Sequence, residues 1–375
     1  MKRLHLNLHE ASSPETGFGQ FEWHIASGLW RLGRYRIDAV AHRINVKGLP
    51  FPVRRGFIPR RFFFGSRPWH RWCPFSYNTL VGDFWSDVSL FFTNTMPELR
   101  ICGKSIAMVY DLIPFRIPDL LLKDSYTKAS LADYCRQHEY LARHADKVVT
   151  ISEYSRREIV KEFGIEECEI PVVPCGVNAR RFASHAEGDA AESEVKAKYG
   201  LPDRFVLYLG TTATYKNVEN LIRGYARMSD VIRRNVGLVV TNGNDKLERV
   251  AREEGVASHV KFLGYVNERD KPALYRLASA YGFLSRIEGF GLTPLEAMAA
   301  GVPTLVSNCA TLPEVVGDGA LIVGPDDISG IASALERMLE DRALCAGLVA
   351  RGRERAAKFT WDNAVLKMAK VIDDI

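Results

Sequence analysis

The second half of the chain alternates between short, continuous apolar runs and segments with helical periodicity. Residues 205–209 form one such run, and after it Val218, Leu221, Ile222 and Tyr225 repeat at the spacing of one helical face. Short strands without polar alternation are buried on both faces, which is typical of a parallel sheet covered by helices. The other apolar runs of this half lie at 237–240, 260–263, 280–284 and 302–306.

The first half repeats the pattern, so we predict an α/β protein with two Rossmann-like domains. A polar segment rich in Ala and Glu, 183–198, separates the halves, and we place the domains at 1–185 and 186–360. Two such sheets facing each other form a cleft at their carboxyl ends, where open α/β folds bind ligands. The expected elements of the first half are strands at 4–8, 37–41, 88–92, 106–110 and 148–151, with helices at 20–32 and 125–144.

The cysteines and the apolar runs limit the class of protein. Seven scattered cysteines without a C-x-x-C pair are typical of reduced thiols in a cytoplasmic protein, not of a disulfide scaffold or structural zinc site. No run approaches the roughly 18 apolar residues of a membrane-spanning helix. The first ten residues contain no apolar core of a secretory signal. We therefore expect a cytoplasmic, folded protein.

One stretch of the first half is strongly basic. Residues 39–82 contain eight Lys or Arg and no Asp or Glu, interleaved with Phe and Trp. Cations alternating with aromatic rings suit an anionic membrane surface or a lipid-linked acceptor, so 43–72 is a candidate for peripheral attachment to the inner face of the plasma membrane. The alternative is a basic loop whose rings pack inward. Nucleic acid is disfavoured because the rest of the chain is close to neutral and has no recognised nucleic-acid module.

The segment 288–303 combines glycines, two glutamates and helix-capping residues. Thr293 is expected to be the N-cap of a helix over 294–300, with Pro294 at the first helical position and Glu296 completing a capping box. Gly301 is expected to be its left-handed C-cap. Glu296 therefore has two open interpretations, as a capping residue or as a ligand of substrate hydroxyls.

The start of that predicted helix is a candidate anion site. The backbone amides of Gly291, Leu292 and Thr293 lack helical partners, and the helix dipole favours negative charge there. Glu288 lies in the glycine loop at the end of an apolar strand and has no capping role, which indicates a ligand-facing carboxylate.

A cation follows another predicted strand. Lys216 ends the loop 210–216 and precedes Asn217, the expected N-cap of the next helix. A lysine beside a helix N-terminus suits a phosphate group, although an ordinary surface lysine would look the same.

These residues resemble the retaining glycosyltransferases of family 4, which have the GT-B fold. The signature is Glu288 and Glu296, separated by seven residues within 285–303. The resemblance covers nearly the whole chain except about 43–85, and it looks closest to mannosyltransferase-like members that build bacterial surface polysaccharides. The other matching segments are 16–19, 109–114, 148–156, 172–178, 216–217, 262–266 and 312–318.

The resemblance implies roles for individual residues. Glu288 would face the donor sugar hydroxyls, Glu296 would hold the ribose hydroxyls, and Lys216 would contact the diphosphate together with the 291–293 amides. Tyr265 and Val266 would border the nucleobase. From the first domain, Gly17 and Gly19 would close on the phosphates or the acceptor. The segment 361–375 would be a helix that returns to the first domain, as in the family.

The chain departs from the family at two places. Tyr110 stands where many relatives have His, beside Asp111, and these two residues are the candidates near the acceptor or donor sugar. The 210–216 loop has Thr211 and Thr212 where relatives often carry Arg. Arg286 is the hypothesised replacement for that charge.

The expected function is retaining, metal-independent transfer of mannose or a related hexose. The expected donor is GDP-linked, the acceptor is a lipid-linked surface polysaccharide or glycolipid, and no cofactor is expected. A nicotinamide-dependent oxidoreductase is disfavoured because Gly17-x-Gly19 is followed by Glu22 and Gly289-x-Gly291 by Pro294, so neither completes G-x-G-x-x-G. A non-transferring sugar-nucleotide-binding or epimerase-like protein stays open because of Tyr110.

Overall fold

The protein is described by a computed structural model that covers residues 1–8, 16–41, 48–55, 86–92, 96, 100–124, 126–183 and 188–375. Two compact units make up the chain. Unit 1 comprises Met1–Pro118, Ser125–Gly176 and Trp361–Ile375, and unit 2 comprises Asp119–Asp124 and Val177–Thr360. Of the basic and aromatic stretch 43–85, only 48–55 is among the described residues, so its predicted contact with a membrane stays a prediction.

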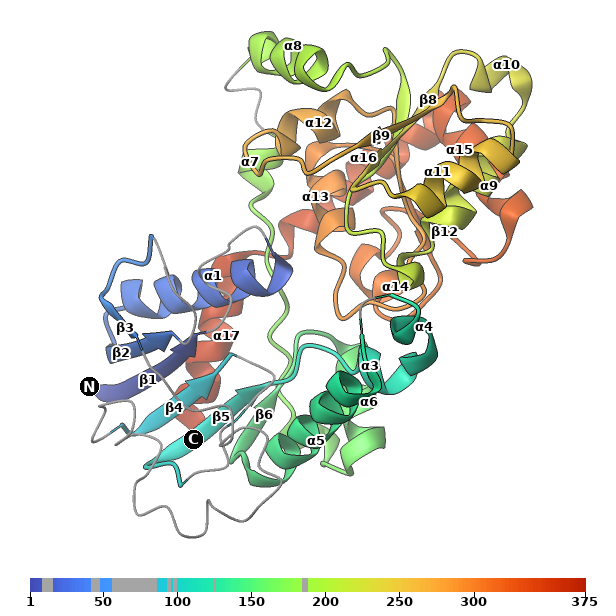
Figure 1. The fold of residues 1–375 in the computed structure, drawn as a ribbon. Coiled ribbons are helices and arrows are strands. Elements are labelled where there is room, and N and C mark those ends of the chain that lie inside the picture. The colour runs from blue at the N-terminus through green and yellow to red at the C-terminus, as the bar shows by residue number, and fades with distance from the viewer. Residues whose placement is uncertain are drawn as a thin grey trace. The chain divides into compact units, whose positions relative to one another are not determined.

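Unit 1 is built on a six-stranded parallel sheet in the order β3-β2-β1-β4-β5-β6 (Figure 1). The five predicted strands are confirmed. The added strand, β3, has two arginines in three residues and lies at the sheet edge, so no apolar run marks it in the sequence. The strands are β1 (Lys2–Leu8), β2 (Tyr35–Ala41), β3 (Val53–Arg55), β4 (Val88–Phe91), β5 (Lys104–Met108) and β6 (Lys147–Val149).

The C-terminal helix α17 (Trp361–Asp374) belongs to unit 1 and lies beside α1 (Gly17–Arg31) (Figure 1). The Trp361 ring stacks on His24 with 4.3 Å between ring centroids. Val365 contacts α1 at Gly28, where a side chain would leave no room. The other helices among the described residues of unit 1 are α3 (Ile113–Arg116), α5 (Lys128–His144), α6 (Glu153–Phe163) and the short η3 (Glu167–Glu169). Helix α4 (Pro118–Leu122) belongs to unit 2 except for its first residue.

Unit 2 contains a second six-stranded parallel sheet, in the order β12-β11-β10-β7-β8-β9. Its five predicted strands are confirmed, and β12, a three-residue edge strand, is additional. The strand order reverses between β7 and β10, which makes their carboxyl ends the topological switch point of this sheet. The strands are β7 (Phe205–Tyr208), β8 (Gly237–Thr241), β9 (Val260–Leu263), β10 (Ala280–Phe283), β11 (Thr304–Ser307) and β12 (Leu321–Val323).

The chain passes into unit 2 at Val177, before the predicted boundary at 185. The polar segment 183–198, expected to be a linker followed by the start of a helix, contains most of α8, which packs against α12 within unit 2. The helices of unit 2 are α7 (Ala179–Ala183), α8 (Gly188–Tyr199), η4 (Thr214–Lys216), α9 (Val218–Arg227), α10 (Asp230–Arg233), α11 (Asp245–Glu253), α12 (Lys271–Leu277), α13 (Leu292–Ala300), α14 (Leu312–Val316), α15 (Ile328–Glu340) and α16 (Arg342–Ala357).

The contact between α1 and α17 gives a test of the packing in unit 1. In Gly28→Ala the new Cβ would lie 2.2 Å from Val365 Cγ2, so we expect the free energy of unfolding to fall. Overpacking of this kind costs about 1–3 kcal/mol. Thermal denaturation measures the loss. The matched control is Gly347→Ala in α16, where the new Cβ meets only the flexible end of Arg351. Equal stability of the two variants would contradict this packing.

Candidate active site

The candidate site lies at the switch point of unit 2, where β7 and β10 are hydrogen-bonded neighbours. The loop after β7 ends at Lys216, and the loop after β10 contains Glu288. Hydrogen bonds to one backbone carbonyl join the two loops. The Arg286 N–H donates to the Tyr215 carbonyl at 2.8 Å, and the Ser285 Oγ donates to the same oxygen at 3.3 Å. Residues 72 positions apart in the sequence are thereby held together.

Lys216 and Glu288 form an ion pair, with 2.6 Å between Nζ and Oε1. Their side chains are only 14% and 11% exposed, so each charge has lost most of its hydration. The ammonium also lies 5.0 Å from the ring centroid of Tyr215 and 5.5 Å from that of Phe283. A nearly buried pair of this kind is strong because water screens it little, and removing one partner would leave an uncompensated charge.

Helix α13 begins two residues earlier than predicted, and its N-terminal cap is different. It starts at Leu292 behind Gly291, which has φ 111°, and no side chain of the described residues caps it. The predicted N-cap at Thr293 and the capping box with Glu296 are therefore wrong. Glycine turns the chain into the helix by its backbone alone, so Thr293 falls inside the first turn. The predicted left-handed cap at Gly301 is confirmed, with φ 82°.

Glu296 is a buried carboxylate held by a tyrosine. It is 4% exposed, and the Tyr275 hydroxyl donates to its Oε2 at 3.0 Å. Burial raises the pKa of the Glu296 carboxyl, while Lys271 opposes that rise. A buried acid is costly to the fold unless it is hydrogen-bonded. With the capping box wrong, the role of Glu296 as a ligand of substrate hydroxyls stays a prediction.

Aromatic rings form a layer beneath the site. Tyr208 stacks on Phe283, Phe283 on Tyr281, and Tyr281 meets Tyr275 edge-on, with centroid distances of 5.9, 6.2 and 5.6 Å. The buried hydroxyls are satisfied: Tyr281 donates to the Leu209 carbonyl at 3.2 Å. Burial raises the pKa of the Tyr208 and Tyr281 hydroxyls well above the ordinary value, so they are neutral donors. Sequence reasoning missed this layer because three of its members look like ordinary strand residues and Tyr275 looks like an ordinary helix residue.

Four predicted donor-binding residues lie on two loops of unit 2, after β7 and after β9. Thr212 Oγ1 donates to the Asn242 carbonyl at 2.7 Å, and the Thr211 carbonyl accepts the Tyr208 hydroxyl. After β9, Tyr265 is 56% exposed whereas Val266 is buried. The structure thus places the two threonines in the loop between β7 and Lys216. Tyr265 and Val266 follow β9, which is separated from β7 by β8 in the sheet. Their roles toward a donor stay predictions.

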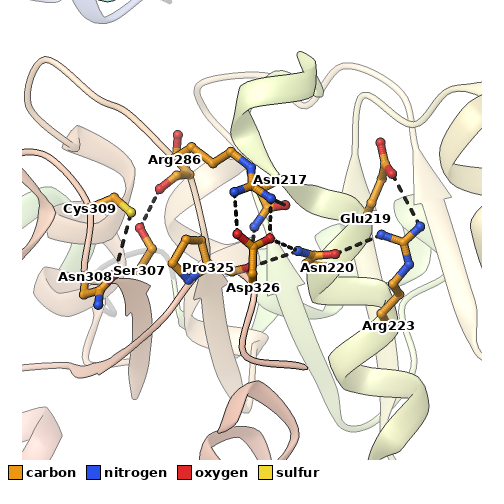
Figure 2. Close-up of polar contacts among 11 residues, drawn as sticks. Asn217, Glu219, Asn220, Arg223, Arg286, Ser307, Asn308, Cys309, Pro325 and Asp326 are labelled. Carbon is orange, nitrogen blue, oxygen red and sulfur yellow. Dashed lines mark hydrogen bonds and ion pairs between the residues drawn. The ribbon is translucent and has the colours of Figure 1, made fainter. Parts of the chain in front are cut away.

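The Arg286 guanidinium is bound to side chains of unit 2, so its predicted role as the replacement for the missing cation of the 210–216 loop stays a prediction. Its Nη1 donates to Asp326 Oδ2 at 2.7 Å, its Nη2 contacts Asp326 Oδ1, and Nη2 also donates to Asn217 Oδ1 at 3.3 Å (Figure 2). Sequence reasoning missed Asp326, which follows the three-residue edge strand β12, an apolar run too short to be predicted as a strand. Asn217 does precede α9, but its side chain does not cap that helix; Nδ2 donates to the Pro325 carbonyl at 2.7 Å instead.

In unit 1, Tyr110 contacts Phe18, which lies between the predicted site residues Gly17 and Gly19. The buried Tyr110 ring lies 4.6 Å from that of Phe18 and 5.5 Å from that of Phe21, measured between centroids. Gly17 and Gly19 flank Phe18 in the first turn of α1, where Thr16 Oγ1 accepts the Gly19 N–H at 2.9 Å. This arrangement places both glycines next to the residue that departs from the family pattern.

Asp111 is held by its own loop. Its Oδ1 accepts the Ile113 N–H at 3.0 Å, and its carbonyl accepts the Tyr134 hydroxyl at 2.9 Å. Ser155 Oγ donates to the Tyr110 carbonyl at 3.0 Å. The Tyr110–Asp111 peptide is therefore fixed from two helices, α5 and α6. A role of Asp111 in chemistry stays a prediction.

Within the described residues, no cluster of three or more His, Cys, Asp or Glu side chains could hold a metal ion. The six described cysteines are free. None of the described helices is long and apolar enough to span a membrane. Metal-independent chemistry stays a prediction.

Two family models match the chain in consecutive segments. One described as Glycosyl transferases group 1 matches residues 191–355, and one described as Glycosyltransferase Family 4 matches residues 23–181. Among solved structures, WaaG, a glycosyltransferase involved in lipopolysaccharide biosynthesis, has a TM-score of 0.75 over 98% of this chain and 99% of its own, at 17% identity. This likeness and the two parallel sheets confirm the GT-B fold class.

The chain is also similar to curated relatives. It is 31% identical to the O-antigen chain mannosyltransferase B of Escherichia coli over 69% of this chain and 68% of the relative. It is 32% identical to a GDP-mannose-dependent alpha-(1-6)-phosphatidylinositol monomannoside mannosyltransferase of Mycobacterium tuberculosis over 60% of each. The chain spans about a third (35%) of the length of the E. coli serotype-specific mannosyltransferase WbdA, which it matches at 29% identity over 76% of this chain.

The ion pair of the site gives a stability test. Lys216→Met should lower the free energy of unfolding by about 2–3 kcal/mol, because Glu288 would remain as a nearly buried, unpaired charge. Adding Glu288→Gln should recover most of that loss. Urea denaturation measures both. The control is Lys196→Met: its partner Asp203 lies at the same 2.6 Å, but both side chains are exposed, so the loss should stay below about 1 kcal/mol. Equal losses in the two methionine variants would contradict the assignment.

The raised pKa of Glu296 predicts a pH-dependent stability. At pH 7 the variant Glu296→Gln should have a free energy of unfolding about 1 kcal/mol higher than that of the wild type, because the buried charge is removed. The wild type is least penalised below the ordinary glutamate pKa of 4.5 and loses stability as the pH rises through the raised value. The gain should therefore vanish near pH 4. Glu340→Gln, at an exposed site, is the control, and a gain that persists at pH 4 would assign the effect to packing.

Proposed function

Because the chain belongs to the glycosyltransferases of group 1 and family 4, we propose that it transfers mannose from GDP-mannose to a surface polysaccharide or glycolipid. The observation that carries the proposal is the nearly buried contact between Lys216 and Glu288 at the switch point of unit 2. A cation and a carboxylate at this position match a diphosphate next to a hydroxyl-rich sugar.

The choice of donor and acceptor is supported by what the relatives are called. One is named as GDP-mannose-dependent and acts on a phosphatidylinositol monomannoside, and another is named as an O-antigen chain mannosyltransferase. We extend to this chain the GDP-linked donor and a lipid-linked or growing glycan acceptor. The basic and aromatic stretch 43–72 would meet an anionic membrane that carries such an acceptor, because it has eight cations within 39–82 and no acid.

Donor binding would change the partner of Lys216. In the structure its ammonium is neutralised by Glu288. A diphosphate carries more negative charge than a single carboxylate, so it would attract the ammonium and free Glu288 to accept hydrogen bonds from the sugar hydroxyls. The first amides of α13, at Leu292 and Thr293, would add donors to the diphosphate. Lys216 would thus keep a negatively charged partner, and Glu288 would exchange its ion pair for hydrogen bonds from the sugar.

The remaining donor contacts follow from the other loops of unit 2. Glu296, buried against Tyr275, would accept from the ribose hydroxyls with the oxygen that the tyrosine does not hold. Tyr265 and Val266 would border the guanine base. These assignments extend the resemblance, and the burial of Glu296 is the observation that supports them most.

We propose retention of the anomeric configuration. The bond between the anomeric carbon and the β-phosphate oxygen breaks, and the acceptor oxygen bonds to the same face of that carbon. The acceptor proton passes to the departing phosphate oxygen, so no protein nucleophile is required. Lys216 and the α13 amides stabilise the charge on the leaving group without a metal ion. Tyr110 and Asp111 are proposed near the sugar or the acceptor.

The proposal predicts a large loss of turnover in Lys216→Ala. Losing one preorganised donor to a developing charge costs about 10² in rate, and we expect at least that loss in GDP release from GDP-mannose with water as acceptor. The control is Lys246→Ala, an exposed lysine of the same unit that pairs with Glu219, and its rate should be unchanged.

Four outcomes would contradict parts of the proposal. Near-normal turnover in Lys216→Ala would remove this lysine from the site. Turnover of UDP-glucose but not GDP-mannose would overturn the donor assignment, and loss of activity in EDTA that Mg²⁺ restores would overturn metal independence. Tight binding of GDP-mannose without any turnover would favour a protein that binds sugar nucleotides and does not transfer.

A further inference from the structure

Beside the ion pair lies a polar cluster to which the proposed function gives no role. It comprises Arg286, Asn217, Asn220 and Asp326, which point toward one another (Figure 2). Asp326 follows β12, Arg286 follows β10, and the two asparagines lie at the start of α9. The cluster therefore links the ends of β10 and β12 to the start of α9.

Arg286 contacts the residues on both sides of Lys216. Its own N–H donates to the carbonyl of Tyr215, the residue before the lysine, at 2.8 Å. Its guanidinium donates to the side chain of Asn217, the residue after the lysine, at 3.3 Å. Lys216 is thus the central residue of a three-residue segment whose neighbours both contact one arginine.

Asn217 needs such support because of its backbone. It has φ 58° and ψ 33°, the left-handed conformation, which asparagine tolerates at a modest energetic cost. Its side chain is 5% exposed and bonded at both ends, by Nδ2 to Pro325 and by Oδ1 to Arg286. These bonds fix the turn that directs the Lys216 side chain toward Glu288.

Asp326 in turn holds Arg286. Both carboxylate oxygens contact the guanidinium, and Asn220 Nδ2 donates to Oδ1 at 2.9 Å. Asn220 also donates to the Pro325 carbonyl at 2.9 Å and accepts from Arg223 Nη1 at 2.9 Å. The hydrogen bond from Arg286 lowers the pKa of the Asp326 carboxyl, so the carboxylate is charged at neutral pH. A two-point contact of this type fixes the plane of a guanidinium.

We infer that Arg286 and Asp326 are positioning residues that hold Lys216 in place for the departing diphosphate. This inference rests on the proposed function for the role of Lys216, and it replaces the direct contact with the donor expected for Arg286. A phosphate group would have to compete for the guanidinium with a carboxylate that already contacts it through both oxygens. Small displacements of a catalytic group are costly, since about 1 Å can reduce the rate a hundredfold.

The test is Asp326→Ala, measured as GDP release from GDP-mannose. We expect kcat to fall about tenfold to a hundredfold while KM changes little, because the lysine is misplaced and the rest of the donor site is intact. Asp326→Asn keeps the size and shape of the side chain but loses the charge and one of the two acceptor oxygens, so its kcat should lie between those of the wild type and Asp326→Ala. Asp318→Ala is the control, an exposed aspartate whose closest approach to Arg351 is 3.6 Å, and it should match the wild type.

A double mutant separates positioning from direct binding. If Asp326 acts through Lys216, Lys216→Ala combined with Asp326→Ala should be no slower than Lys216→Ala alone. Multiplied losses in the double mutant would overturn the inference. A lower KM in Asp326→Ala would also overturn it, since that result means that the freed Arg286 binds the donor itself.

Hydrogen exchange tests the inference even where the donor is wrong. In Asp326→Ala, the N–H groups of Lys216, Asn217 and Arg286 should exchange faster, because their bonds to Ala213, Thr214 and Tyr215 are no longer supported. They should be unchanged in Asp318→Ala. Absence of turnover by the wild type with every nucleotide-sugar would count against the proposed function alone, whereas unchanged exchange in Asp326→Ala would overturn the positioning role alone.

Discussion

The contact between Lys216 and Glu288 is the interaction on which the candidate site depends. It exists because β7 and β10 are adjacent in the sheet although far apart in the sequence, so the loops that follow them meet. Two charges that have lost most of their water are stable only while each has a partner. In the structure they serve each other, and a diphosphate-linked sugar would supply a replacement for both. The same feature therefore explains how two nearly buried charges are tolerated in the structure and why the site would prefer such a ligand.

The surroundings of this pair are built to limit its movement. Aromatic rings pack beneath it with their hydroxyls bonded, and Gly291 turns the chain into α13 without using a side chain. On the side of Lys216, the contacts of Arg286 and Asp326 fix the flanking backbone. Glu296 lies buried nearby, where desolvation raises the pKa of its carboxyl and the Tyr275 hydroxyl donates to it.

Much of the fold and part of the site could be predicted from the sequence. Continuous apolar runs identified the central strands, but the two edge strands were not predicted: β3 has two arginines in three residues, and β12 is apolar but only three residues long. Glu288 and Lys216 were found because each follows a buried strand. The capping box at Glu296 was wrong because the backbone conformation of Gly291 replaced the side-chain cap. Asp326 and Tyr275 were missed because their function lies in contacts with distant residues, which local spacing does not encode.

A crystal structure of the protein with bound GDP-mannose tests the central claim most directly. The Lys216 ammonium should then lie within hydrogen-bond distance of a diphosphate oxygen, about 2.7–2.9 Å for a charged pair, with Glu288 turned toward the mannose hydroxyls and Arg286 still bound to Asp326. A donor bound elsewhere, with the Lys216–Glu288 contact unchanged, would contradict the claim that this pair receives the diphosphate-linked sugar.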